Sequence, residues 1–227
     1  MTTTAEHGVK LLALLCMVLT RVPLSAQVGH DPGSSPYHDI RRGHVLRLLG
    51  GYLNGGRGTV PVGPTGGATA GLRYEYQIST FFVFTSTVAY AQATAFFYNT
   101  RDSVPIRRGP VNNDVVMIDW GLQAALTGGK TFHGFQPFVG GSIGLASAPH
   151  IGADSSGYSF GTKLTITPEV GLRWFPTNHL SLEMDYRMVH WKLNYPLSYR
   201  SYLIPALGNL IDWTTQRWVS ASLGWTF

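Results

Sequence analysis

The sequence predicts an all-β fold, a transmembrane, eight-stranded, antiparallel up-and-down β-barrel, on the basis of three observations. First, residues 218–227 alternate between apolar and small or polar side chains, with the period of two that a strand requires. Second, charged residues make up 13% of the chain, against roughly 25% in ordinary soluble domains. Third, seven further segments have strand-like patterns, and after residue 26 no unbroken apolar run reaches the roughly 20 residues of a membrane-spanning helix. Alternating strands with an apolar outer face explain all three.

The N-terminal part of the chain has the pattern of a secretory signal. Residues 11–20 are apolar and follow Lys10, and Ser25 and Ala26 supply the small residues that a signal peptidase recognises. We therefore expect cleavage after Ala26, a flexible periplasmic lead at 27–41 and a single barrel domain at 42–227. Cys16, the one cysteine, lies in the signal, so the mature chain can form neither a disulfide scaffold nor a thiolate metal site.

Eight segments are expected to form the barrel strands. They are residues 42–53, 66–77, 80–98, 114–127, 135–148, 161–175, 180–195 and 214–227. The connections alternate in length: those at 54–65, 99–113, 149–160 and 196–213 are long, and those at 78–79, 128–134 and 176–179 are shorter. Membrane barrels have this pattern, with long extracellular loops and short periplasmic turns. In segment 80–98 both parities are largely apolar, so the pattern does not assign its lipid face.

Charged residues in the strands fall on the parity opposite the large apolar residues, and this parity is expected to face the lumen. The predicted lumen charge network is Arg47, Arg73, Lys163, Arg173 and Arg187 against Glu75, Asp119, Glu169, Glu183 and Asp185. The lumen of an eight-stranded barrel is just wide enough for side chains, so ten ionised groups there must neutralise one another. We favour a paired plug, and a narrow polar conduit gated by Arg and Glu is the alternative.

Aromatic residues cluster near the expected strand ends, where interfacial girdles are the favoured interpretation and a ligand-stacking surface is the alternative. Those expected near the periplasmic ends are Tyr74, Tyr76, Trp174, Phe175, Trp225 and Phe227, and those near the outer ends are Phe96, Phe97, Tyr98, Trp191 and Tyr195.

The C-terminal strand carries a more specific pattern. Its apolar parity consists of Val219, Ala221, Leu223, Trp225 and Phe227. This strand resembles the C-terminal signature that the outer-membrane assembly machinery reads, and with residues 171–187 it makes the chain similar to small outer-membrane barrels of the OmpA, OmpX and OmpW type. The resemblance implies a monomer in a Gram-negative-type outer membrane, in contact with lipid and lipopolysaccharide. We expect a structural, adhesive or small-solute-permeability role without catalysis or cofactor, because fold alone does not give function.

One segment offers an enzymatic alternative. Arg187, His190 and Asn194 make it similar to the strand motif of PagL-type lipid A deacylases, in which an arginine precedes a His-x-Ser-Asn segment and a downstream carboxylate orients the histidine. Lys192 stands where the nucleophilic serine belongs, and lysine cannot replace serine in this ester hydrolysis. We therefore expect no enzyme, and instead expect His190, Lys192 and Arg217 to lie at the outer rim and contact lipopolysaccharide phosphates.

Other binding partners have little support in the sequence. The net charge of +5 raises nucleic acid as a partner, but no basic cluster is interleaved with stacking aromatics. Metal binding is not expected, because His133, His150, His179 and His190 are isolated and lack ligand spacing. The mild basic excess of the loops fits solvated charge as well as it fits lipopolysaccharide contact or adhesion.

Overall fold

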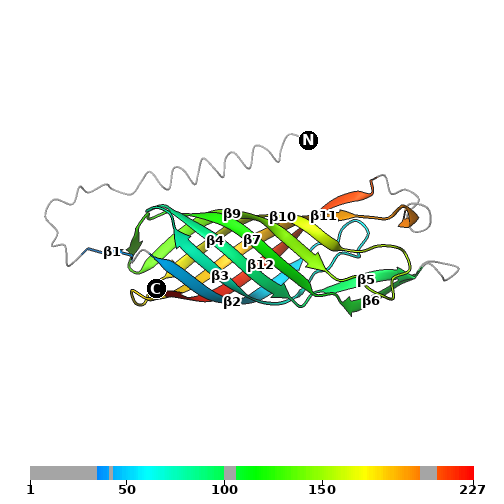
Figure 1. Cartoon of the computed structure of the whole chain (residues 1–227), viewed down its shortest axis with the longest axis horizontal. Coiled ribbons are helices and arrows are strands. Elements are labelled where there is room, and N and C mark those ends of the chain that lie inside the picture. The colour runs from blue at the N-terminus through cyan, green and yellow to red at the C-terminus, as the bar shows by residue number, and fades with distance from the viewer. Residues whose placement is uncertain (1–34, 41–42, 100–105, 200–208) are drawn as a thin grey trace, which may run out of the picture. The chain divides into compact units, whose positions relative to one another are not determined.

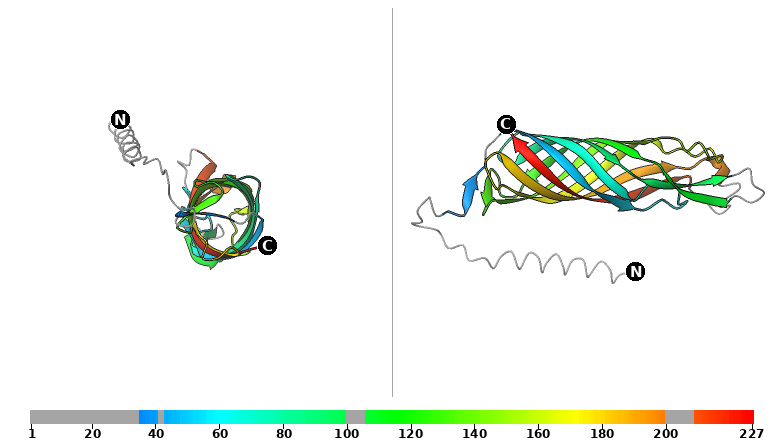
Figure 2. Two further views of the ribbon diagram at one scale, coloured as in Figure 1. Left: turned by 90° about the vertical axis from the view of Figure 1, so that its left-hand side faces the viewer. Right: turned by 90° about the horizontal axis from the view of Figure 1, so that it is seen from below.

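The computed structural model describes residues 35–40, 43–99, 106–199 and 209–227, and in them the chain forms a closed barrel of eight antiparallel strands (Figures 1 and 2). The barrel strands are β2 (His44–Gly55), β3 (Gly67–Gln77), β4 (Phe82–Ala91), β7 (Val115–Ala125), β9 (Phe135–Ala148), β10 (Gly161–Trp174), β11 (Leu180–Asn194) and β12 (Ile211–Thr226). Each pairs with the next in this order, and β12 pairs with β2 from Gln216↔Gly55 to Thr226↔Val45. The predicted fold class is confirmed.

The outer face of the barrel is apolar, as the predicted parity requires. Along β10, for example, Leu164, Ile166 and Val170 are exposed, whereas Thr165, Thr167 and Glu169 are buried inside the barrel. A soluble protein rarely exposes so extensive an apolar surface, whereas a membrane barrel must. In the part of the chain that the structure describes, no helix is long and apolar enough to cross a membrane.

The two ends of the barrel differ. At one end, the short-turn end, the connections 78–81, 126–134 and 175–179 join the strands, and the C-terminus lies there (Figure 1). There, Phe227 N donates to His44 O at 3.0 Å and His44 N donates to Phe227 O at 3.3 Å, which continues the β12–β2 seam to the last residue. At the other end, the long-loop end, lie the described residues of the connections 56–66, 92–114, 149–160 and 195–210.

Segment 80–98 is not one strand, which corrects the prediction. β4 ends at Ala91, and β5 (Thr94–Asn99) pairs with β6 (Ile106–Asn112) in a separate two-stranded sheet beyond the barrel (Figure 1). Reciprocal hydrogen bonds between Thr94 and Thr65 hold the chain where it leaves the barrel. Both parities are apolar because β4 has a lipid-facing side and also an inward side that packs in an apolar part of the lumen, while β5 buries Ala95 and Phe97.

A short strand also lies in the segment that was expected to be a flexible lead. β1 (Tyr37–Asp39) pairs with β8 (Lys130–Phe132), which belongs to the connection between β7 and β9. The predicted signal at 1–26, residues 27–34 and 41 of the predicted lead, and residue 42 of the predicted first strand lie outside the described residues. The other seven predicted strands differ from the observed ones by at most three residues at either end.

Candidate functional site

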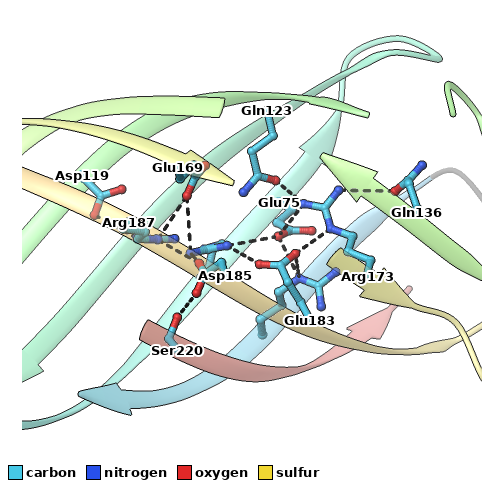
Figure 3. A network of polar contacts seen from close by, with 12 residues as sticks. Glu75, Asp119, Gln123, Gln136, Glu169, Arg173, Glu183, Asp185, Arg187 and Ser220 are labelled. Atoms are coloured by element: carbon cyan, nitrogen blue, oxygen red, sulfur yellow. Dashed lines mark hydrogen bonds and ion pairs between the residues drawn. The ribbon is translucent and has the colours of Figure 1, made fainter. Parts of the chain in front are cut away.

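The lumen nearer the short-turn end contains a charge cluster, shown in Figure 3, of which every member is at most 6% exposed. Five strands contribute to it, because each places its inward parity toward the same axis. The members of the charge cluster are Arg47 on β2, Arg73 and Glu75 on β3, Asp119 on β7, Glu169 and Arg173 on β10, and Glu183, Asp185 and Arg187 on β11.

Ion pairs connect the charge cluster from strand to strand. Arg73 Nη1 lies 2.5 Å from Glu183 Oε1, and its Nη2 lies 2.7 Å from Asp185 Oδ2. Glu183 also accepts from Arg173 Nε at 2.6 Å, and Asp185 from Arg187 Nε at 2.9 Å. Removing such ions from water costs several kcal/mol each, so their pairing is what makes this burial tolerable.

Further contacts complete the charge cluster. Arg47 Nε lies 2.7 Å from Glu75 Oε1, and Ser220 donates to Asp185. At Gly224 of β12, a Cβ atom would lie 2.6 Å from Arg47 Nη1, so an inward side chain there would displace the guanidinium. The absence of a side chain at this position therefore makes room for a buried arginine.

Lys163, predicted for the same network, takes no part in the charge cluster. It lies partly exposed near the long-loop end of β10, whereas Glu169 and Arg173 of the same strand lie deeper. Parity predicts which face a residue occupies but not its depth in the barrel. Four basic groups, all guanidinium groups, therefore oppose five carboxylates, where five basic groups including Lys163 were expected.

The lumen nearer the long-loop end is apolar, which the sequence interpretation missed. Trp191 and Trp218 are 0% and 1% exposed, respectively, and lie among aliphatic and aromatic side chains that we call the apolar plug. Its members are Leu49, Leu53, Val60, Val62, Ala89, Ala91, Ala93, Val115, Met117, Ala146, Ala148, Tyr158, Phe160, Val189, Trp191, Leu193, Tyr195, Tyr199 and Trp218.

The apolar plug corrects part of the girdle prediction. Trp191 and Tyr195 face inward, and Phe96, Phe97 and Tyr98 belong to β5, outside the barrel. The sequence pattern did indicate that Trp191 faces inward, because Trp191 shares the inward parity of Arg187 on β11. At the short-turn end the outward positions hold the exposed residues Tyr74, Tyr76, Trp174, Trp225 and Phe227, whereas Phe175 is half-buried.

The charge cluster and the apolar plug are in direct contact. Arg187 lies over the Trp218 ring, with Cζ 4.8 Å from its centroid, and Trp218 Nε1 donates to Thr69 Oγ1 at 2.9 Å. A guanidinium over an indole face is a favourable arrangement for a desolvated cation. Two stacked layers, one ionic and one apolar, therefore fill the lumen.

Loop residues form the part of the apolar plug nearest the long-loop end. The rings of Tyr158, Tyr195 and Tyr199 pack together with centroids 5.9–6.2 Å apart. Tyr195 Oη donates to Asp212 Oδ2 at 3.2 Å, and the same carboxylate accepts from Thr59 N at 2.5 Å. Burial, followed by the nearby Asp212 charge, raises the pKa of Tyr195, and burial raises the pKa of Tyr199. Both phenols therefore stay neutral at physiological pH.

The predicted rim residues face outward on β11 and β12. His190 is half-buried, its Nδ1 lies 2.8 Å from Thr215 Oγ1, and Arg217 is exposed on β12 opposite Met188. Lys192 follows His190 on the same face.

Among the residues that the structure describes, the surroundings of His190 lack the groups of a serine hydrolase. Its ring contacts a hydroxyl where such a site needs a carboxylate, and Asp212, the one acidic residue after His190 in the sequence, is bound to Tyr195 and Thr59. Ser198 donates to Ser156 O at 2.6 Å, and Ser201 lies outside the described residues. Within the described ranges, no group of three or more His, Cys, Asp or Glu side chains is placed to hold a metal ion.

Comparison with known proteins supports the fold. No protein-family model matches the chain, and no curated protein matches it. Among solved structures, Neisserial surface protein A matches with a TM-score of 0.54 and 13% identity, over 81% of this chain and 97% of that one. The outer-membrane protein OprG of Pseudomonas aeruginosa matches with a TM-score of 0.50 and 14% identity, over 86% and 99%. The chain has the fold of the small outer-membrane barrels.

Within this barrel fold, the C-terminal strand is the closing strand. Val219, Leu223, Trp225 and Phe227 point outward and are exposed, and Ala221 shares their face. β12 pairs along its length with both β11 and β2. The proposed assembly signal therefore coincides with the seam that joins the two ends of the sheet.

Proposed function

We propose that this protein is a bacterial outer-membrane barrel with a closed lumen and a structural and adhesive role, without catalytic activity. The short-turn end lies in the periplasm in this proposal, and the long-loop end faces the cell exterior. A cleaved signal takes the chain across the inner membrane. The barrel then acts as a rigid anchor that presents its loops and the β5–β6 hairpin.

The filled lumen carries this proposal. A permeant solute would have to pass the ion pairs of Arg73 and then displace Trp218 and Trp191, which are almost completely buried. Channels that conduct need a continuous path of water or of coordinating groups. The ionic layer followed by the apolar layer favours the plug over the gated conduit.

The long-loop end supports the adhesive role. Arg57 and Arg107 both lie over the Phe96 ring, with Cζ atoms 4.8 and 4.4 Å from its centroid, which stabilises the β5–β6 hairpin. β6 exposes Ile106, Arg107 and Arg108. Basic and apolar groups side by side on a protruding hairpin are suited to an anionic surface partner.

Liposome swelling tests the closed lumen. Proteoliposomes that contain the folded barrel should swell in isotonic sugar no faster than protein-free liposomes, whereas a general porin in matched liposomes should give rapid swelling. Rapid swelling with this barrel would support a permeability role instead.

The deacylase remains the runner-up, and lipid A tests it. We expect the same acyl-chain composition, by mass spectrometry, in lipid A from cells with and without the protein, because position 192 is a lysine and His190 Nδ1 lies against the Thr215 hydroxyl in the described part of the chain. Loss of one acyl chain in the expressing cells would establish the hydrolase.

A further inference from the structure

The lipid-facing wall of the barrel has a groove of about 830 Å³ across β4, β7, β9 and β10 that reaches β11. Two rows of residues in strand register form it. The first row is Phe84, Leu122, Gly141 and Pro168, and the second is Trp120, Ile143, Ile166 and His190. The groove lies on the outer face of the barrel, and the proposed roles of the closed lumen and of the β5–β6 hairpin do not involve it.

The groove is hollow because Gly141 and Pro168 lie together in the first row. A Cβ atom on Gly141 would meet one backbone oxygen, that of Thr167, at 3.8 Å, so the packing admits a side chain there. By contrast, a Cβ on the inward Gly144 would lie 2.2 Å from Ile118 O. The packing around position 141 therefore does not require a glycine, and a larger side chain there would fill the groove.

The groove runs across the membrane depth. Barrel strands tilt by about 35–45°, so rows across them climb toward one end. Phe84 lies near the start of β4 at the short-turn end, whereas His190 lies near the long-loop end of β11. An acyl chain of the outer leaflet would follow the same direction, with its headgroup at the His190 end.

Basic side chains surround that end. His190 lines the groove, Lys192 follows it on the same face, and Arg217 lies on the neighbouring strand. Arg217 also lines an adjacent hollow of about 520 Å³ with Asn54 and Thr215. The carboxylate of Asp212, the nearest acid on β12, accepts from Tyr195 and Thr59 at the loops. The headgroup end therefore carries positive charge.

We propose that this groove binds an acyl chain of a phosphorylated outer-leaflet glycolipid of the lipid A class, whose phosphate contacts Lys192 and Arg217. Any lipid chain can occupy an apolar groove in a bilayer. A preference for the phosphorylated lipid over the same lipid without phosphate must therefore come from the contacts of its phosphate with Lys192 and Arg217. The site rests on the outer-membrane location proposed above but not on the closed lumen. A conducting barrel would refute the proposed function and leave this site intact.

Native mass spectrometry of the full-length, detergent-solubilised barrel tests the headgroup contacts. Titration with bisphosphorylated lipid A should give a one-to-one adduct that an excess of inorganic phosphate does not displace. Lipid A stripped of its phosphates should bind more weakly, and Lys192→Gln and Arg217→Gln should each weaken binding of the intact lipid by about fivefold. Equal binding of the two lipids, or displacement by free phosphate, would overturn the proposal.

Two matched glycine variants test the groove. Gly141→Leu fills it and should reduce the lipid A adduct at least as much as either charge substitution. Gly50→Leu is the control, because Gly50 also faces outward on β2, a Cβ there would likewise meet one backbone oxygen at 3.8 Å, and it does not line the groove. Both variants should keep the heat-modifiable gel shift of a folded barrel. Unchanged lipid A binding by folded Gly141→Leu would exclude the groove as the site.

Discussion

Arg73 is the residue that ties the charge cluster together, because its guanidinium reaches two carboxylates on β11 from β3, across the lumen. It also lies 3.9 Å from Glu169 on β10. At this scale the sequence predicted well which face each charge occupies, since alternation assigns it. Alternation could not predict how far along the barrel axis a side chain lies or which residue it pairs with. Lys163 was therefore grouped with charges that lie nearer the short-turn end, and the ionic and apolar layers were not distinguished.

The first prediction concerns Arg73. Arg73→Met leaves Glu183 and Asp185 short of a buried counter-ion, and breaking such pairs typically costs about 3–5 kcal/mol. We expect the unfolding free energy in urea, followed by tryptophan fluorescence in micelles, to fall by about this amount.

Lys163→Met is the control for that measurement, because it removes a basic group of the same barrel that lies outside the charge cluster and is partly exposed. Its effect should stay within about 0.5 kcal/mol. Equal destabilisation by the two variants would show that the network of Arg73 has no special role in stability.

At the scale of elements, β12 shows that alternation predicts the face of a strand, and the β5–β6 hairpin shows that it does not predict where a strand ends. The alternation of β12 predicted its lipid face, and the predicted eight-stranded barrel implies that its last strand pairs with its first, as β12 does with β2. Segment 80–98 was assigned wrongly, because an apolar pattern on both parities does not show where a chain leaves one sheet for another. That exit depends on the contacts of Thr94 with Thr65 and with Arg57, which come from a distant loop.

The second prediction concerns the closing strand. Deleting Phe227 removes two backbone hydrogen bonds to His44 and an exposed aromatic ring at the short-turn end. We expect most of the truncated protein to fail to insert, as judged by loss of the heat-modifiable gel shift in outer-membrane fractions. Phe227→Tyr keeps the backbone and an aromatic ring and should insert normally. Normal insertion of the truncated chain would remove the assembly role assigned to this residue.

The third prediction concerns the hairpin. The double variant Arg107→Gln, Arg108→Gln should reduce adhesion of expressing cells to a surface coated with an anionic polymer, and the effect should weaken as salt screens the charges. Lys130→Gln is the control, because Lys130 is also an exposed cation but lies at the short-turn end. Equal adhesion of the double variant and the unsubstituted protein would argue against this surface as the adhesive one.

At the scale of the whole molecule, two layers fill a barrel whose fold the sequence predicted. Low charge content, alternation and loop lengths together indicated the architecture, because each follows from the bilayer as solvent. The apolar plug was not predicted, although its strand residues share the inward parity, because apolar residues on both faces of a strand leave no contrast to detect, and its loop residues have no strand parity. Its three tyrosines, Tyr158, Tyr195 and Tyr199, come from two different connections, and tertiary structure alone brings them together.

The closed lumen is the central claim, and planar-bilayer recording of the purified, folded barrel tests it most directly. We predict no discrete conductance steps at neutral pH, because the ion pairs of Arg73 and the buried Trp191 and Trp218 leave no continuous path for ions. Regular, voltage-independent single-channel steps from heat-modifiable protein would contradict the claim and identify the barrel as a pore.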